Sequence, residues 1–194
     1  WSDNVDGMEE IAQESAAFLA FVVEKVPDEY GPIAMKGNWA VYDAAFKRAG
    51  IVRVATLGDL FDCAELLAKQ PRPRGPRLGI VTNGGGPGVM AADALEGCGL
   101  SLTKLSDKTR QALDEVLPAY WSRGNPVDVL GDASPERYAG AVRICLDASE
   151  FDAILALFSP QALTKPTQTA QAVVDRSKGT GVPVFTAWVG GAEV

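Results

Sequence analysis

The fold is decided by the stretch Val81-Thr82-Asn83-Gly84-Gly85-Gly86-Pro87-Gly88-Val89. An apolar run, residues 78–82, leads into it, and a helical pattern, residues 88–97, leads out of it. Glycines at such a junction allow a tight turn. Pro87 is tolerated near the first helical turn because its missing N–H would have no partner there. The stretch therefore predicts a strand, a glycine-rich loop and a helix in succession.

The same stretch predicts a phosphate-binding loop. Backbone N–H groups at a helix N-terminus point toward a bound anion, and the helix dipole adds positive charge. The lack of Gly-Lys-Ser/Thr excludes a P-loop, and the glycine spacing fits a dinucleotide fingerprint poorly. A plain tight turn is the alternative. The residues assigned to phosphate binding are Asn83, Gly84, Gly85, Gly86, Pro87, Gly88 and Val89.

Strand patterns and helix patterns alternate outward from this loop. Such alternation gives right-handed βαβ units and a parallel sheet with helices on both faces, so the predicted fold class is α/β. Strands are expected at residues 78–82, 100–105, 126–130, 151–158 and 182–189. Helices are expected at residues 88–97, 106–117, 134–146 and 167–177, with Ser106 and Ser134 as caps.

A smaller helical and mixed segment is expected before the sheet. Helical patterns occupy residues 9–25 and 39–48, and a short β-type run occupies residues 51–54. A third helix is expected to begin at Thr56, whose side chain can form a capping box with Asp59 three residues on.

The proline-rich segment that follows is the expected domain boundary. Its three prolines fix φ and remove N–H donors, so neither a helix nor a central strand fits there. Residues 1–70 are expected to be a remnant of a preceding domain, residues 71–76 a linker, and residues 77–194 the α/β domain, truncated at its C-terminus. The whole chain is expected to be a fragment or a processed chain.

Composition limits the classes of function. The 194 residues are 47% hydrophobic and 22% charged, the balance of a globular protein with a core. A net charge of −7 disfavours nucleic acid and anionic lipid, whose binding needs clustered Lys and Arg. No apolar run is long enough for a membrane helix and no basic leader is present, so the expected location is the cytoplasm.

The side chains that most often carry chemistry are scarce. The chain has no histidine, so the usual general base and the usual metal ligand are missing. Cys63, Cys98 and Cys145 are too few and too widely spaced for a disulfide framework or a zinc site. They are expected to be buried, reduced thiols, and no metal site is expected.

Two further loops follow strands, at the ends where α/β sheets bind ligands. In the first, Asn125 is pushed to an extended conformation by Pro126, so its side chain can project from the strand edge, while Asp128 can hold the loop by accepting N–H bonds. In the second, Ser159 and Gln161 can donate hydrogen bonds to a ligand. A structural turn and an ordinary strand exit are the respective alternatives.

Three runs in the same order resemble the NDP-forming acyl-CoA synthetases, relatives of succinyl-CoA synthetase. They are Ala-Val-Tyr-Asp-Ala-Ala-Phe-Lys-Arg-Ala-Gly-Ile at residues 40–51, the run at residues 78–89, and Gly-Asn-Pro-Val-Asp at residues 124–128. The resemblance implies a flavodoxin-like ligase-CoA domain. It also implies a reversible reaction in which an acyl-CoA, phosphate and ADP give a carboxylic acid, CoA and ATP.

The resemblance also implies an intermediate and partners. The family works through an acyl phosphate and a phosphorylated histidine, whose phosphate is cradled by two helix N-termini. The loop at residues 83–88 matches one of them, and Asn125 and Asp128 match the family's second loop. CoA and ADP or ATP, with Mg²⁺, are the implied cofactors of the complete enzyme. A CoA-binding Rossmann domain and an ATP-grasp domain are the implied partners, in an oligomer.

The chain departs from the family at the nucleophile. The Ser-His-Thr-Gly segment is replaced by Glu-Tyr-Gly-Pro-Ile-Ala-Met at residues 29–35, so no catalytic residue is assigned and the chain alone is expected to be inactive. One hypothesis is part of a working acid–CoA ligase. A second is an inactive ligase-like module that senses acyl-CoA or regulates, as in fused protein acetyltransferases. A third is a mononucleotide-binding protein of flavodoxin type.

Overall fold

The computed structural model describes residues 21–22, 44, 46, 48–54 and 56–190, and the chain divides into two compact units, Trp1–Gln70 and Pro71–Val194. In the first unit, β1 (Phe21–Val22) pairs in parallel with β2 (Arg53–Val54). The predicted helix at residues 9–25 is wrong at Phe21–Val22, because pairing with β2 overrides the helical period there. The rest of that prediction lies outside the described residues.

The third predicted helix of this unit is confirmed as α3 (Leu57–Lys69). Thr56 caps it through a reciprocal pair of bonds: the Asp59 N–H donates to Thr56 Oγ1 and the Thr56 N–H donates to Asp59 Oδ2, both at 3.1 Å. Of the predicted helix at residues 39–48, the described Ala44, Phe46 and Arg48 are helical.

The second unit is built on a parallel sheet of four strands in the order β4-β3-β5-β6. This arrangement confirms the α/β fold class. The strands are β3 (Leu78–Thr82), β4 (Val127–Asp128), β5 (Ala153–Phe158) and β6 (Val184–Trp188). The helices are α4 (Gly85–Gly97), α5 (Asp107–Val116), α6 (Pro135–Asp147) and α7 (Pro166–Ser177).

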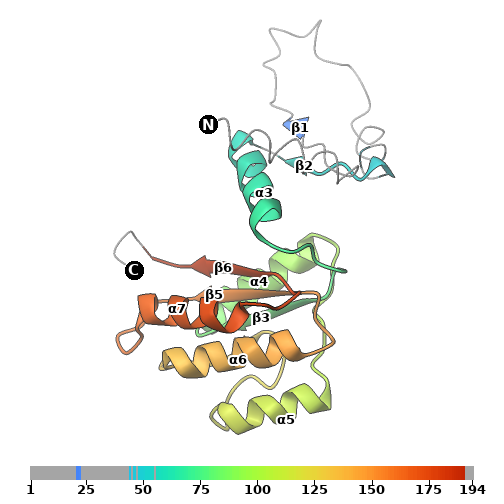
Figure 1. Cartoon of the computed structure of the whole chain (residues 1–194). Coiled ribbons are helices and arrows are strands. Elements are labelled where there is room, and N and C mark those ends of the chain that lie inside the picture. The colour runs from blue at the N-terminus through green and yellow to red at the C-terminus, as the bar shows by residue number, and fades with distance from the viewer. Residues whose placement is uncertain (1–20, 23–43, 45, 47, 55, 191–194) are drawn as a thin grey trace, which may run out of the picture. The chain divides into compact units, whose positions relative to one another are not determined.

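Helices cover both faces of this sheet, with α6 and α7 on one face and α4 on the other (Figure 1). Because successive strand residues point to opposite faces, Ile154, Ala156 and Phe158 of β5 enter the main core, which also holds buried side chains of α6 and α7. Ile80 and Leu157 are buried outside that core, on the face that α4 covers. The strands are therefore held between two apolar layers.

The predicted strand at residues 100–105 is wrong, since the structure assigns no strand to these described residues. The Asn125 side chain provides the link to β3 instead. Its Nδ2 donates to Leu78 O at 2.8 Å and to Thr103 O at 3.0 Å, and its Oδ1 accepts from the Ile80 N–H at 2.9 Å. A side-chain amide thus takes the place of a backbone ladder.

Smaller corrections concern element ends and thiols. Helix α4 begins at Gly85, three residues before the expected start, so two glycines lie in its first turn. Strand β4 is shorter than the predicted run at residues 126–130, because Pro126 has no N–H and Leu130 turns away with a φ of 73°. Cys145 is buried as expected, but Cys98 is exposed and Cys63 is half-buried.

No helix in the described part of the chain has the length and apolar character needed to cross a bilayer.

Candidate functional site

The site lies where the direction of the strand connections changes. From β3 the chain passes through α4 and returns to the sheet as β4, on the side of β3 away from β5. From β5 it passes through α7 and returns as β6, on the side of β5 away from β3. Open parallel sheets bind ligands in the crevice outside the carboxyl ends of two such strands. The loops that follow β3 and β5 therefore form the expected ligand-binding region.

A buried pair of residues ties these two loops together. Asn83 Nδ2 donates to Ser159 O at 2.7 Å, and the Ser159 N–H donates to Asn83 Oδ1 at 2.8 Å. Asn83 is 1% exposed, so water does not compete for its amide. The pair fixes the spacing between the glycine-rich loop and the loop after β5.

The N-terminus of α4 lacks a side-chain cap. Gly84 is its N-cap residue, whereas α3, α5 and α6 are capped by Thr56, Ser106 and Ser134. The Gly84 N–H donates to Thr82 Oγ1 at 3.1 Å, and Thr82 Oγ1 donates to Gly84 O at 2.9 Å. The first N–H groups of a helix have no partner within the helix. Those of Gly85 and Gly86 are left available by the described residues.

Glycine at these positions keeps the approach to the N–H groups open. A Cβ on Gly86 would have no atom within 4 Å, and a Cβ on Gly85 would meet Asp128 Oδ2 at 3.5 Å. Gly88 differs, because its Cβ would lie 3.0 Å from Thr82 Cγ2 and 3.4 Å from Pro126 Cβ. Close packing therefore accounts for glycine at residue 88, whereas no contact with the described residues requires glycine at residue 86.

A buried hydroxyl without a partner lies beside the same helix end. Ser159 Oγ is inaccessible to water and has no hydrogen-bond partner among the described residues. It lies 3.2 Å from the position of a Cβ on Gly84. An unpaired buried polar group costs roughly 1–3 kcal/mol. A ligand oxygen held at the start of α4 could provide the missing acceptor once the Ser159 side chain rotates toward it.

Asp128 brings a negative charge to this point. Its Oδ1 accepts from the Leu130 N–H at 2.9 Å, and its own N–H donates to Ser122 Oγ at 2.9 Å. Its other oxygen faces Gly85. A carboxylate beside a helix N-terminus is stabilised by the helix dipole. Asp128 therefore balances the positive end of α4 and would limit where a second anion can lie.

The other predicted site residues have supporting positions. Gln161, which is exposed, packs against Gly131, with its Cδ 3.4 Å from a Cβ placed there, so the loops after β4 and β5 touch. The Asn125 amide is used within the sheet, as described above, and Pro126 packs under Gly88. Val89 is 59% exposed on α4.

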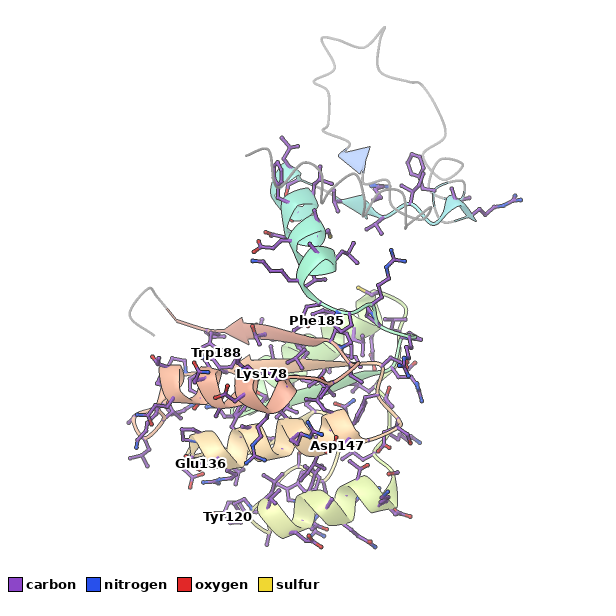
Figure 2. All side chains as sticks on the ribbon, in the orientation of Figure 1. Tyr120, Glu136, Asp147, Lys178, Phe185 and Trp188 are labelled. Carbon is purple, nitrogen blue, oxygen red and sulfur yellow. The ribbon has the colours of Figure 1, made fainter. Side chains whose placement is uncertain are left out.

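Charges of both signs lie along this end of the molecule. The pKa of Glu136, in the first turn of α6, is held low by its own backbone N–H, by the Ser134 hydroxyl and by the nearby Lys165 (Figure 2). Arg137 donates to Asp132 Oδ1 and to Asp132 O, each at 3.0 Å, and so fastens the loop after β4. No group of three or more Cys, Asp or Glu side chains comes together in the described residues.

One buried residue near the site was missed by sequence reasoning. Tyr138 on α6 places its hydroxyl 2.7 Å from Leu157 O and 3.1 Å from Val81 O, on the two strands that lead to the site. Its helical spacing indicates only a core position, and no local pattern identifies its hydrogen-bond partners.

Comparison with known proteins gives consistent matches. Residues 78–194 match the Ligase-CoA domain family. The chain is 38% identical over 162 residues to the acetate–CoA ligase (ADP-forming) I subunit alpha of Pyrococcus furiosus, covering 82% of this chain and 35% of that subunit. It is 39% identical to the acetate–CoA ligase (ADP-forming) I of Archaeoglobus fulgidus, covering 74% of this chain and 21% of that protein. The chain thus spans about a third and about a fifth of these relatives' lengths.

A solved structure is similar as well. The dinucleotide-forming acetyl-coenzyme A synthetase 1 of Ca. Korarchaeum cryptofilum, in complex with phosphate and ADP, superimposes with a TM-score of 0.75 at 35% identity. The match covers 81% of this chain and 34% of that chain.

Proposed function

Because this chain belongs to the Ligase-CoA domain family, we propose that it is part of an NDP-forming acid–CoA ligase and supplies that enzyme's phosphate-binding loop. The reaction would convert an acyl-CoA, phosphate and ADP into a carboxylic acid, CoA and ATP. The loop consists of residues 83–89, with Ser159 beside it. The proposal draws on relatives that are ADP-forming acetate–CoA ligases and on the geometry at the start of α4.

One observation carries the assignment of phosphate to this loop. Three donors at the start of α4 have no partner among the described residues: the N–H groups of Gly85 and Gly86 and the buried Ser159 hydroxyl. Two of them belong to a helix N-terminus, whose dipole favours an anion. A phosphate placed there would accept hydrogen bonds from both N–H groups, and rotation of the Ser159 side chain would bring its hydroxyl to the same anion.

The chemistry of such a loop is electrostatic. Donors that are already in place stabilise the negative charge of a transferring phosphoryl group without moving a proton. The Asn83–Ser159 pair holds these donors in place, because it joins the loops that carry them. Asp128 Oδ2 lies beside Gly85, so its negative charge would oppose the phosphate and weaken its binding at this loop.

The remaining parts of the reaction would come from other domains. CoA and ADP or ATP would bind to a CoA-binding Rossmann domain and an ATP-grasp domain in an oligomeric enzyme. Mg²⁺ would be held with the nucleotide, and we assign it no ligand in the described residues. Residues 1–70 would end a preceding ligase domain and residues 71–76 would link it to the sheet. This chain has no histidine, so it would not turn over alone.

The lack of histidine also favours a second candidate function. A ligase-like module without its nucleophile could still bind an acyl-CoA or a phosphate group and act as a regulatory domain. Acetyl-CoA-dependent ATP formation by the protein that contains this sequence, assayed with ADP and phosphate, separates the two. Turnover supports the ligase, and acyl-CoA binding without turnover supports the regulatory module.

The phosphate site can be tested on the 194-residue chain. Phosphate is titrated into ¹⁵N-labelled protein at constant ionic strength, with chloride as the control salt. We expect saturable shifts of the Gly85 and Gly86 amide signals. Gly86→Glu places a carboxylate at the open position and should abolish them.

Gly97→Glu is the matched control variant. It makes the same change at the exposed far end of α4, where a Cβ also meets no atom within 4 Å, and it should bind phosphate like the parent. If phosphate leaves the Gly85 and Gly86 signals of the parent unchanged, the loop is a tight turn and the phosphate assignment is rejected.

A further inference from the structure

The hydroxyl of Tyr138 reaches both strands that carry the candidate site. It lies 2.7 Å from Leu157 O and 3.1 Å from Val81 O. Leu157 precedes Ser159 by two residues, and Val81 precedes Asn83 by two residues. One hydroxyl hydrogen is thus shared by the two backbone carbonyls that lie directly beneath the two loops of the site.

The position of this hydroxyl is fixed by packing. The Tyr138 ring is fully buried and contacts Phe158, with centroids 6.0 Å apart, and Trp188, with centroids 6.3 Å apart. Phe158 and Trp188 stack on each other, with ring centroids 5.1 Å apart. Side chains packed in this way have little freedom to change rotamer. The hydroxyl therefore acts as a fixed point between β3 and β5.

In addition to the backbone ladder that pairs β3 with β5, two side-chain connections join these strands at successive levels. The Asn83–Ser159 pair joins the loops themselves, and Tyr138 joins the strands one step below, from the face that α6 covers. Burial raises the pKa of the Tyr138 hydroxyl above its usual range, so this group remains a hydrogen-bond donor throughout the neutral pH range.

We infer that Tyr138 is a positioning residue of the phosphate site, setting the spacing between the N-terminus of α4 and Ser159. The inference rests on the proposed function, because the bound phosphate is part of that proposal. Tyr138 does not touch the anion. It acts through the backbone of Val81 and Leu157, because a shift of either strand end moves the Gly85 and Gly86 N–H groups relative to Ser159 Oγ.

The test replaces Tyr138 by Phe, which removes the hydroxyl and keeps the ring contacts. The matched control is Thr109→Val, which deletes another buried hydroxyl. Thr109 is 5% exposed, lies in the first turn of α5 and accepts a bond from Ser106 Oγ at 3.0 Å. Ser106 is in turn joined to Glu150, which precedes β5, so the control lies at the amino-terminal end of the sheet.

Two readouts are measured on the parent and on both variants. In the free protein, the amide signals of Gly85, Gly86 and Ser159 should shift in Tyr138→Phe and remain in place in Thr109→Val. On titration with inorganic phosphate, the Kd should rise about tenfold in Tyr138→Phe, as expected for the loss of about one hydrogen bond, and stay at the parent value in Thr109→Val.

The outcomes separate this inference from the proposed function. Unchanged loop signals in free Tyr138→Phe, or equal changes in both variants, would overturn the positioning role whatever phosphate does. Phosphate binding by the parent with the same Kd in Tyr138→Phe would overturn it as well. If the parent binds no phosphate, the phosphate site itself is rejected. The amide signals of the free proteins still decide whether Tyr138 sets the spacing of the loops.

Discussion

Two asparagine side chains in this domain form the hydrogen bonds that backbone peptide groups usually form between neighbouring segments. Asn83 exchanges a donor and an acceptor with Ser159, and Asn125 does the same with Leu78, Ile80 and Thr103. A side-chain amide has the same donor and acceptor groups as a peptide unit, so it can join two segments where no ladder forms. The two residues therefore shape the sheet beneath and between the loops of the site.

Asn125→Asp should strongly destabilise the fold. The new oxygen would face Leu78 O and Thr103 O, two acceptors that then lose their donor. We expect a loss of about 1–3 kcal/mol in the free energy of unfolding, measured by urea denaturation at pH 7. Gln168→Glu, the same chemical change at an exposed residue of α7, is the control. A loss no larger than that of the control would contradict this role of Asn125.

A second prediction concerns the ion pair at the start of β3. Asp152 is buried and accepts from Arg77 Nε and Arg77 Nη2, each at 2.8 Å, and from the Arg77 N–H at 3.1 Å. The hydrogen bonds from Arg77 hold the pKa of the Asp152 carboxyl below its usual range. The unfolded chain therefore binds more protons than the folded one as the pH falls below about 4.

It follows that Asp152 stabilises the fold above its unfolded pKa and that this contribution is lost as the pH falls through the lower, folded pKa. Asp152→Asn should lower stability at pH 7, and the gap between variant and parent should narrow below about pH 4. Urea unfolding at a series of pH values between about 3 and 7 measures the gap. A gap that is constant with pH would show that charge is not the cause.

At the scale of elements, α4 lacks the side-chain cap that α3, α5 and α6 have, and α7 lacks one as well but begins with Pro166. Helices α3, α5 and α6 each begin with a hydroxyl side chain that accepts a backbone N–H, and all three of these caps, Thr56, Ser106 and Ser134, follow the sequence prediction. Helix α4 begins with Gly85 and Gly86 after the N-cap residue Gly84, and it has no such bond. Glycine in a helix costs about 0.5–1 kcal/mol relative to alanine. A run of them at a helix start implies a requirement other than stability.

Gly86→Ala tests this requirement. The new methyl group meets no atom within 4 Å, so stability should stay the same or rise by up to about 1 kcal/mol, while phosphate affinity should fall because the methyl group narrows the approach to the N–H groups. Gly140→Ala, inside α6 and equally free of contacts, should raise stability without affecting phosphate. Thermal unfolding and phosphate titration give the two readouts. Equal phosphate affinity in both variants would remove the reason for glycine at residue 86.

At the scale of the whole molecule, the second unit holds its own core. All residues of the main apolar cluster lie between Val81 and Val184. The linker is anchored within the same unit, because a Cβ on Gly75 would lie 2.6 Å from Asp152 Oδ2. The part from Pro71 onward therefore meets the usual conditions for folding alone.

We expect residues 71–194 to fold independently when produced without the first unit. Their ¹H–¹⁵N spectrum should overlay the corresponding signals of the 194-residue chain, and unfolding should be a single cooperative transition. A chain of residues 71–194 that lacks dispersed signals would contradict this organisation and would assign part of the core's stability to the first unit.

Much of this protein was determined by sequence patterns acting within a few residues. The alternation of strands and helices and the caps at Thr56, Ser106 and Ser134 were predicted, because periodicity and capping depend on neighbours three or four residues away. The resemblance to NDP-forming acyl-CoA synthetases is confirmed, since its motifs are likewise continuous stretches of sequence. The strand predicted at residues 100–105 failed, because its pairing was replaced by a side chain 22 residues beyond Thr103.

Only the tertiary structure decided how these pieces meet. The strand order and the reversal of connections between β3 and β5 depend on contacts between distant segments, and the pairing of Asn83 with Ser159 joins residues 76 positions apart. Tyr138 reaches Val81 across 57 positions, and its spacing in the sequence indicates nothing beyond a buried helical face. Contacts of this range depend on which faces pack together, and the physical reason is that no local pattern encodes the partner of a buried hydrogen bond.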